Sequence, residues 1–447
     1  MASSSNVDAP GATIVLCALG AFLVVAFAGL VGDARLDGHP VPSAPAAASV
    51  DPEGDEGRDE REPASNRPTV EAAFAAESYR PGSVARLVSF DSARRVSIRL
   101  YRVADASGRL RPRDEMRGIP VGPARELGPL ARGQTIRLLL GNWPTGLYYA
   151  ALTAPGGRLG YAPFVLAPAR LGEHPIAVVL PTQTWQAYNF RDDDGDGSPD
   201  TWYEGPPHAT AGLHRPFENR GVPPHYRYYD EPFLRWLARN HYAVDFISDA
   251  ELNAYGGDAL TRAYHLLIFS GHHEYVTTHE YDAVTRFRDQ GGSLLFLSAN
   301  NFYAKVTIEN GVMTRVGWWR LLGRPEAALV GVEFFHSDLG EHRGPWVVRA
   351  APAGRWIFRG TGLARGDPFS SGGIEADNVV AASPRNVQVL AEIVNLYGDG
   401  RNAQMTYYRT RAGGEVFAAG AFSLACSIWQ PPVSRMVANL IAASVEG

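Results

Sequence analysis

Three apolar runs decide the fold of this chain: PIAVVLP at 175–181, YHLLIFSG at 264–271 and GGSLLFLSAN at 291–300. The first run is apolar throughout rather than alternating, as in a strand buried on both faces of a sheet, and the other two also predict strands. Amphipathic segments typical of helices lie at Glu231 to Asn240 and at Thr278 to Gln290. Alternating strands and helices of this length build a parallel sheet with right-handed crossovers. We therefore predict an α/β domain over residues 172–447, with a mostly parallel sheet flanked by helices.

Upstream of this domain the pattern changes to short segments that alternate between apolar and polar residues. They are separated by Pro-Gly, Gly-Arg and Gly-Gly turns and read SVARLVSF (83–90), RVSIRLYRV (95–103), TIRLLLGNW (135–143) and LYYAALTAP (147–155). Period-two alternation with turns at this spacing is typical of a β-sandwich. We predict a sandwich over residues 69–171 that serves as a structural or positioning module.

The N-terminal part of the chain predicts export. An uncharged apolar run from Ala12 to Gly32 is long enough to span a bilayer. Ala26-Phe27-Ala28 offers a cleavage site, but no Lys or Arg precedes the run, so residues 1–32 fit a signal peptide or an uncleaved membrane anchor. Residues 33–68 are rich in Pro, Ala and charged residues, which predicts a disordered linker. The protein is then periplasmic, extracellular or held at the membrane.

Charge excludes one class of partner. The formal net charge is -5, and the arginines are scattered along the chain instead of clustering on one periodic face. Nucleic-acid-binding proteins carry a basic patch or stripe. We therefore predict no nucleic-acid partner.

Polar side chains follow the three apolar runs. Tyr188 comes after the first, His272 and Glu274 after the second, and Asn300 after the third, while Tyr229 precedes a predicted helix. The carboxyl ends of parallel strands meet at one edge of a sheet, and oxygen donors suit hard metal ions. The ordinary alternatives are a core tyrosine, a buried histidine paired with a carboxylate, and an asparagine that caps a turn.

Two known catalytic patterns do not fit the turn after the second run. In HHEYVTTHE, His273 and His279 are six residues apart, whereas the zinc motif H-E-x-x-H needs them one helical turn apart. A glutamine amidotransferase would place a cysteine nucleophile in this turn, in the manner of a nucleophile elbow. SGHHEY occupies the turn here, so Cys-His catalysis is excluded.

The acidic stretch DDDGDGSPD at 192–200 resembles a calcium loop. Carboxylates at alternate positions, a turn glycine and a later aspartate match that pattern. The candidate ligands are Asp192, Asp194, Asp196, Ser198 and Asp200. The glutamate expected at position twelve is missing, because Tyr203 is there, and a solvated acidic turn is the alternative reading.

Several ordered stretches resemble the large subunit of N,N-dimethylformamidase and its many relatives. They are TQTWQAYNF (182–190), FSGHHEY (269–275), GGSLLFLSANNFY (291–303), RWIFRGTGLARGDPF (355–369), GIEAD (373–377) and GGEVFAAGAF (413–422). SYRPG (78–82) and GYAPFVL (160–166) resemble the ends of the domain found upstream in such proteins. The resemblance implies a fold like that of class I glutamine amidotransferases.

The resemblance also implies a mononuclear ferric iron held by two tyrosines and one glutamate. Matched motif by motif, these ligands are Tyr188 of QAYN, Tyr229 of YYDEP and Glu274 of GHHEY. Tyr228 stands next to Tyr229, so the second ligand is one of these two tyrosines. His272 and Asn300 then lie close by, and Glu375 of GIEAD is a second acidic residue that faces the site.

These observations lead to two function hypotheses. The first is an iron-dependent hydrolase of C–N bonds in small amides, in which His272 or Glu375 moves the proton and Asn300 stabilises the oxyanion. The N-terminal segment implies export, and the amidase that the chain resembles works with a small subunit that this chain does not contain. Both departures argue against dimethylformamide itself as the substrate. The second is a non-enzymatic exported binding protein with a calcium-stabilised loop. Either protein is compatible with a homo-oligomer.

Overall fold

The structure is a computed structural model that describes residues 63–104, 112–204, 209–338, 340–349, 352–422 and 424–446. All of these residues belong to one compact unit, Asp55–Gly447. The predicted N-terminal segment 1–32 and most of the predicted linker 33–68 lie outside the described residues. Within the described ranges, no helix combines the length and the apolar character needed to cross a membrane.

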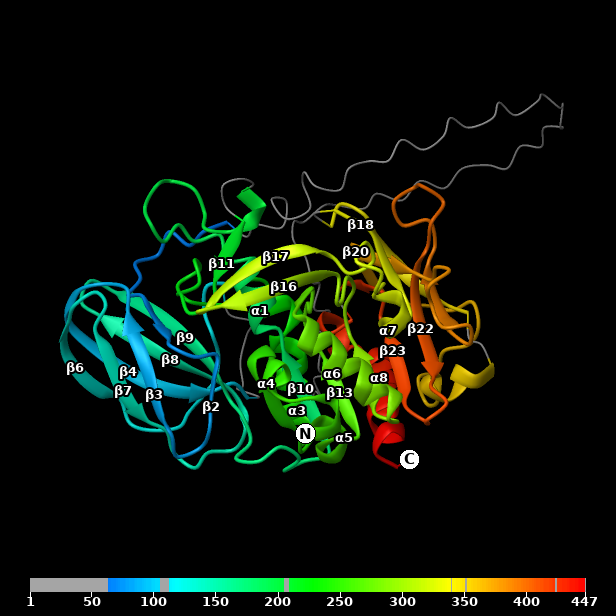
Figure 1. Ribbon diagram of the computed structural model, residues 1–447, viewed down its shortest axis with the longest axis horizontal. Helices are drawn as coiled ribbons and strands as arrows, with labels where there is room; N and C mark the ends of the chain where they lie inside the picture. The colour runs from blue at the N-terminus through cyan, green and yellow to red at the C-terminus, as the bar shows by residue number, and fades with distance from the viewer. Residues whose placement is uncertain are drawn as a thin grey trace, which may run out of the picture. The chain divides into compact units, whose positions relative to one another are not determined.

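The N-terminal region is rich in β structure and holds two sheets (Figure 1). One is antiparallel and contains β1 (Ala72–Phe74), β3 (Val84–Ser89) and β7 (Thr135–Leu139). The other has the order β2-β9-β8-β4-β5, with β6 beside β4, and contains β2 (Ser78–Tyr79), β4 (Ala93–Arg102), β5 (Ile119–Pro120), β6 (Arg125–Leu130), β8 (Gly146–Ala154) and β9 (Arg158–Leu166). Buried and exposed positions alternate along β3 and β7, as the sequence predicts.

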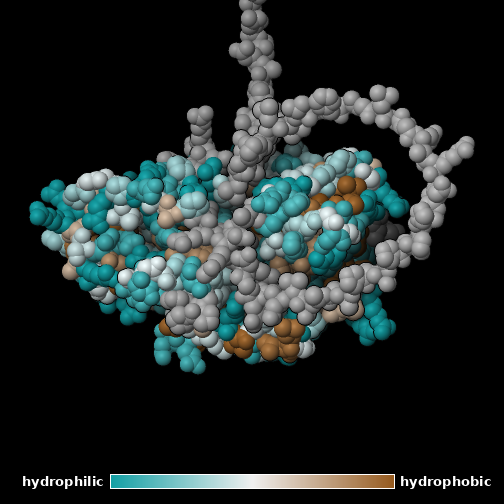
Figure 2. All heavy atoms as spheres, turned by 90° about the horizontal axis from the view of Figure 1, so that it is seen from above, coloured by the Kyte–Doolittle hydropathy of each residue, from teal (hydrophilic) through white to brown (hydrophobic). Residues whose placement is uncertain are grey.

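Side chains from both of these sheets fill one hydrophobic core. Leu87 and Leu138 of the first sheet pack with Ile98 and Phe164 of the second, and each of the four is buried. Burying such side chains contributes roughly 1.5–3 kcal/mol each. Hydrophilic side chains dominate the visible face of the molecule in Figure 2, as expected when apolar side chains lie inside.

The large sheet of the α/β part is mixed. Its parallel half has the order β12-β10-β13-β15-β23 and contains β10 (Ile176–Leu180), β12 (Asp245–Ser248), β13 (Leu266–Phe269), β15 (Ser293–Phe296) and β23 (Glu415–Ala418). Three of these strands come from the apolar runs quoted at the outset. The sequence therefore predicted the class and the core of this sheet correctly.

The other half of the large sheet is antiparallel, which the sequence analysis did not anticipate. It continues from β23 in the order β22-β21-β19-β20-β18, with β24 beside β20. Its members are β18 (Glu333–Ser337), β19 (Arg343–Val348), β20 (Pro368–Asn378), β21 (Gln388–Ile393), β22 (Ala403–Arg409) and β24 (Ala421–Phe422). No α-helix lies between β19 and β23 in the described part of the chain, so no crossover forces these strands to run parallel.

Helices cover both faces of the large sheet. They are α1 (Thr182–Ala187), α2 (Tyr226–Tyr229), α3 (Glu231–Arg239), α4 (Asp249–Ala254), α5 (Gly257–Ala263), α6 (Thr278–Asp289), α7 (Ala327–Val330) and α8 (Pro431–Glu446), with 3-10 turns η1 (Trp202–Glu204), η2 (Pro352–Phe358) and η3 (Cys426–Trp429). Val178 packs in a core with residues of α3 and α8, whereas Val179 packs in another with residues of α5 and α6. Alternate residues of β10 therefore face opposite layers of helices.

A small sheet lies over the end of the parallel strands. It has the order β11-β17-β16-β14 and contains β11 (Thr210–Gly212), β14 (Tyr275–Val276), β16 (Ala304–Glu309) and β17 (Val312–Trp318) (Figure 1). β14 follows β13 and β16 follows β15 along the chain, and the two pair in parallel. This pairing holds the segments after β13 and β15 against each other, which positions the site described next.

Candidate functional site

Tyr188 and Glu274 are brought together by α1. Tyr188 ends this helix, where its backbone N–H donates to the carbonyl of Thr184. The hydroxyl of Thr184 in turn accepts from the backbone N–H of Glu274 at 3.1 Å. The Tyr188 hydroxyl then donates to Oε2 of Glu274 at 2.7 Å, with both side chains buried. Two of the three predicted iron ligands are therefore in direct contact.

His272, Glu375 and Asn300 extend this contact into a buried chain of polar groups. Nε2 of His272 lies 3.6 Å from Oε2 of Glu274 and 3.3 Å from Oε2 of Glu375. The side-chain amide of Asn300 donates to Oε1 of Glu375 at 3.3 Å. All of these residues are buried, so their interactions are little screened by water. The structure thus gathers every residue for which the sequence predicted a catalytic role.

Asn300 is held in a left-handed backbone conformation, with φ of 52°. Its backbone N–H donates to both oxygens of Asp377, at 2.9 and 3.2 Å. Burial raises the pKa of Asp377 to about 7, and the hydrogen bond from the backbone N–H of Asn300 opposes that rise. Asparagine tolerates this conformation better than most residues, and such backbone is common at functional sites.

Tyr229 reaches the same region through ring contacts. It is buried at the end of α2, and its ring stacks on Phe422 at 4.5 Å between centroids and on His225 at 5.1 Å. The Phe422 ring lies 4.8 Å from that of His272, and the His225 ring lies 6.4 Å from that of Tyr188. Tyr229 therefore contacts the ring of Phe422, which touches His272, and the ring of His225, which touches Tyr188; its role as a ligand stays a prediction.

The sequence analysis missed two residues at this site. The Tyr203 hydroxyl lies 3.5 Å from Oε2 of Glu274 and forms a hydrogen bond with the hydroxyl of Tyr275. His225 has a left-handed backbone, with φ of 54°, and its ring contacts those of both Tyr188 and Tyr229. Neither residue follows a strand of the large sheet, so the rule about strand ends could not find them.

Burial sets the protonation of the site. It lowers the pKa of His272 well below its usual range, and nearby His225 and His273 add to this effect. His272 is therefore neutral near pH 7 and can accept a proton. Burial, reinforced by the negative charge of Glu274, raises the pKa of Tyr203 well above its usual range. Tyr203 consequently keeps its proton.

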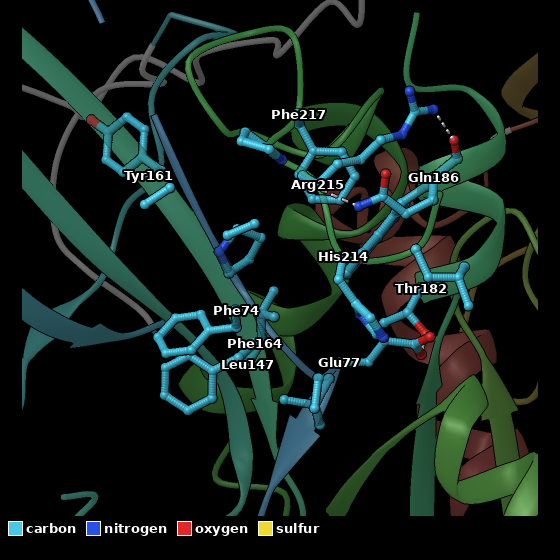
Figure 3. A pocket seen from close by; sticks show the side chains of 18 residues that line it. Phe74, Glu77, Leu147, Tyr161, Phe164, Thr182, Gln186, His214, Arg215 and Phe217 are labelled. Carbon is cyan, nitrogen blue, oxygen red and sulfur yellow. Dashed lines mark hydrogen bonds between the residues drawn. The ribbon is translucent and has the colours of Figure 1, made fainter. Parts of the chain in front are cut away.

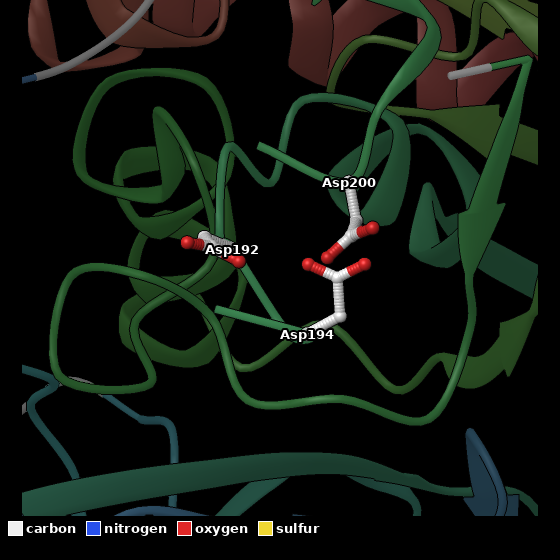
Figure 4. Close-up of side chains that lie close together, drawn as sticks. All are labelled: Asp192, Asp194 and Asp200. Carbon is white, nitrogen blue, oxygen red and sulfur yellow. The ribbon is translucent and has the colours of Figure 1, made fainter. Parts of the chain in front are cut away.

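The acidic loop gathers three of its carboxylates. Asp192, Asp194 and Asp200 each offer an oxygen within 4.8 Å of the others (Figure 4). Asp196 is not part of this group, and its carboxylate accepts from the backbone N–H of Ser198 at 2.8 Å. The backbone amides of Gly195 and Gly197 lower the pKa of Asp192, so it is ionised near pH 7. Calcium binding by this loop stays a prediction.

If the loop binds calcium, the ion should stabilise the fold. A ligand at tenfold excess over its Kd adds about 1.4 kcal/mol to the free energy of unfolding. We expect calcium to raise the midpoint of thermal unfolding of the wild type and of Asp196→Asn, whose carboxylate is outside the group, but not of Asp194→Asn. Equal shifts in all three proteins would place calcium elsewhere.

Comparisons with known proteins identify one family. The profile of a family described as N,N-dimethylformamidase beta subunit-like, C-terminal, matches residues 138–434. No curated protein matches. Among solved structures, the chain is similar to a superoxide reductase (neelaredoxin) from Ignicoccus hospitalis, with 18% identity, 23% of this chain and 80% of that chain covered and a TM-score of 0.14. It is also similar to a cycloisomaltooligosaccharide glucanotransferase from Paenibacillus sp. complexed with cycloisomaltoheptaose, with 11% identity, 56% and 34% covered and a TM-score of 0.16.

These two structural likenesses are too weak to inform fold or activity. The family match is of another kind, because it spans more than half of the chain. It begins in β7 and contains the strand ends that carry Tyr188, Glu274 and Asn300. The chain belongs to the N,N-dimethylformamidase beta subunit-like family.

Proposed function

We propose that the protein is a metal-dependent hydrolase of C–N bonds in small amides, with a mononuclear iron held by Tyr188, Tyr229 and Glu274. The observation that carries this proposal is the buried contact of the Tyr188 hydroxyl with Oε2 of Glu274, 3.6 Å from Nε2 of His272. Membership of the family supports it. We further propose that the large sheet and its helices form the amidotransferase-like fold that the sequence resemblance implies.

The side chains around Glu274 fit an iron ion by the chemistry of their donors. Phenol and carboxylate oxygens are hard ligands suited to a ferric ion. Tyr188, Tyr203 and His272 each place an oxygen or nitrogen atom that could bind a metal within 3.6 Å of one Glu274 oxygen. Bound iron would polarise the amide carbonyl and lower the pKa of water.

The remaining chemistry falls to His272, Glu375 and Asn300. Neutral His272 accepts a proton from the attacking water and returns it to the departing amine nitrogen, which must be protonated to leave. Glu375 orients that imidazole from 3.3 Å. The Asn300 amide, positioned by its bond to Glu375, donates a hydrogen bond to the oxygen that gains negative charge.

The role of Asn300 gives a test with a matched control. Asn300→Gly keeps the left-handed backbone that glycine adopts freely, yet removes the amide. Losing one such donor typically costs about 100- to 1000-fold in kcat. Asn310 also has φ of 52° but lies on an exposed turn, so Asn310→Gly should leave kcat unchanged. If Asn300→Gly has the same kcat as Asn310→Gly, the Asn300 side chain does not stabilise the transition state.

The proposed activity is tested by hydrolysis. Iron-loaded wild-type protein is incubated with a panel of small N-alkyl formamides and acetamides, and the released amine is measured. We expect release that stops when a chelator removes the iron and returns when iron is restored. An iron-loaded protein that releases no amine from any member of the panel would overturn the proposed activity and favour an exported binding protein.

A further inference from the structure

A cavity of about 40 Å³ lies between the β-rich region and α1 (Figure 3). Its lining is mostly apolar and includes the aromatic side chains of Phe74, Tyr161, Phe164, Trp185 and Phe217. One water needs roughly 10–15 Å³ of such volume, so the cavity has room for about three waters or a molecule of about three non-hydrogen atoms. The residues that gather around Glu274 are not among its lining within the described part of the chain.

The charges on the cavity wall favour a cation over an anion. Of the described lining residues, Arg215, His214 and Glu77 carry ionisable groups, besides the phenol of Tyr161. Arg215 is already neutralised, because its guanidinium donates to Asp193 at 2.9 Å and to backbone carbonyls, including that of Gln186 at 3.1 Å. Burial lowers the pKa of His214, so this side chain is neutral near pH 7. Glu77 is left as the acidic group on the cavity wall, and because burial raises its pKa to about 7, it carries its negative charge above that pH.

Behind Glu77 lie further carboxylates instead of a basic partner. Oε2 of Glu77 accepts from the Thr182 hydroxyl at 2.5 Å, and that hydroxyl lies 3.3 Å from Oδ2 of Asp249. Asp249 and Glu251 of α4 and Glu280 of α6 are the charged groups that act on Glu77 among the described residues. All three are acidic, so an ionised Glu77 is stabilised by a positive ion on its cavity side.

We propose that this cavity binds a small organic ammonium ion of about three non-hydrogen atoms, with Glu77 as its counter-ion and the aromatic side chains around its alkyl groups. Dimethylammonium has this size and charge. A metal ion fits less well, because the aromatic and aliphatic wall supplies few oxygen ligands. This site is separate from the proposed hydrolase site and does not rest on that function.

The proposal is tested by calorimetric titration of the whole protein with dimethylammonium chloride at pH 8. The pKa of Glu77 is raised to about 7, first by burial, so Glu77 is mostly ionised at pH 8. We expect saturable binding that Glu77→Gln weakens by at least about tenfold, because a buried ion then loses its counter-charge. Glu126→Gln removes the same charge from an exposed position on β6 and should bind like the wild type.

The size limit of the cavity and the location of the bound ion are tested by the same titration. Ala76→Leu adds a larger side chain to the cavity wall and should abolish binding while the thermal unfolding midpoint stays near that of the wild type. Tetramethylammonium and sodium should not bind saturably. Tyr188→Phe should bind dimethylammonium normally, which separates this site from the iron site. No saturable binding by the wild type, or equal binding by Glu77→Gln and the wild type, would overturn the proposal.

Discussion

Replacing Glu274 with glutamine should remove iron binding and amide hydrolysis together. Oε2 of Glu274 is the atom on which the Tyr188 hydroxyl, the Tyr203 hydroxyl and Nε2 of His272 converge. Glutamine keeps the size of the side chain but removes its negative charge, and a hard cation binds a neutral amide oxygen far more weakly than a carboxylate. Even the partners of metal ligands typically contribute about 10- to 100-fold in affinity, so loss of a ligand should cost more. Iron content and kcat/KM measure the two effects.

A buried glutamate elsewhere provides the control for this substitution. Glu326 is equally buried and accepts from Arg320, and it is not among the proposed iron ligands. Glu326→Gln should lower the free energy of unfolding but leave the iron content at the wild-type level. If Glu274→Gln also retains its iron, Glu274 is not a ligand.

The choice between Tyr228 and Tyr229 needs its own pair of variants. Tyr229 is buried and stacks on Phe422 and His225, whereas Tyr228 is only partly buried at the edge of the same cluster. We expect Tyr229→Phe to lower iron affinity and Tyr228→Phe to leave it unchanged, as measured by competition with a chelator. The reverse result would move the ligand by one position.

The second large effect concerns stability and pH. Burial, the largest cause for both groups, raises the pKa of Glu77 to about 7 and that of Glu280 to about 8, from an ordinary value of 4.5. The folded protein therefore holds protons that the unfolded chain has lost, and stability must fall as pH rises through this window. Between about pH 6.5 and pH 8.5 these two groups alone account for a loss of roughly 3 kcal/mol. Burial also raises the pKa values of Asp230, Glu326 and Asp377 to about 7, which adds to that loss.

Urea unfolding in a buffer free of ammonium ions measures this loss. Glu280→Gln should remove the share that Glu280 contributes, because glutamine preserves the capping box at the start of α6 but does not ionise. The lowered pKa values of His272 and His273 act in the opposite direction, mainly below about pH 7, where histidines of the unfolded chain become charged. Stability that is constant or rises between pH 6.5 and pH 8.5 would contradict this account of the acidic groups.

The parallel half of the large sheet and several site residues could be predicted from local patterns. Continuous apolar runs identified β10, β13 and β15, because strands covered on both faces have no polar side. The rule that functional groups follow such strands then found Tyr188, Glu274 and Asn300. Each of these inferences uses only the residues next to a strand, which is why sequence alone sufficed.

Contacts between distant segments could not be predicted in this way. Glu77 meets Thr182 across 105 positions of the chain, and Glu375 reaches His272 only because β20 lies in the antiparallel half of the sheet. Glu375 was identified from the family resemblance instead of from any local pattern. Tyr203 approaches Tyr188 from the short 3-10 turn η1 and His225 from the residue before α2, and such short segments give no periodic signal in the sequence.

The central claim is that Tyr188 and Glu274 hold an iron ion, and spectroscopy of the purified whole protein tests it most directly. The claim predicts one iron per chain with a visible tyrosinate-to-iron charge-transfer band in the wild type, and loss of that band in Tyr188→Phe. A wild-type protein that remains colourless after loading with ferric iron, or a band of equal strength in Tyr188→Phe, would contradict it.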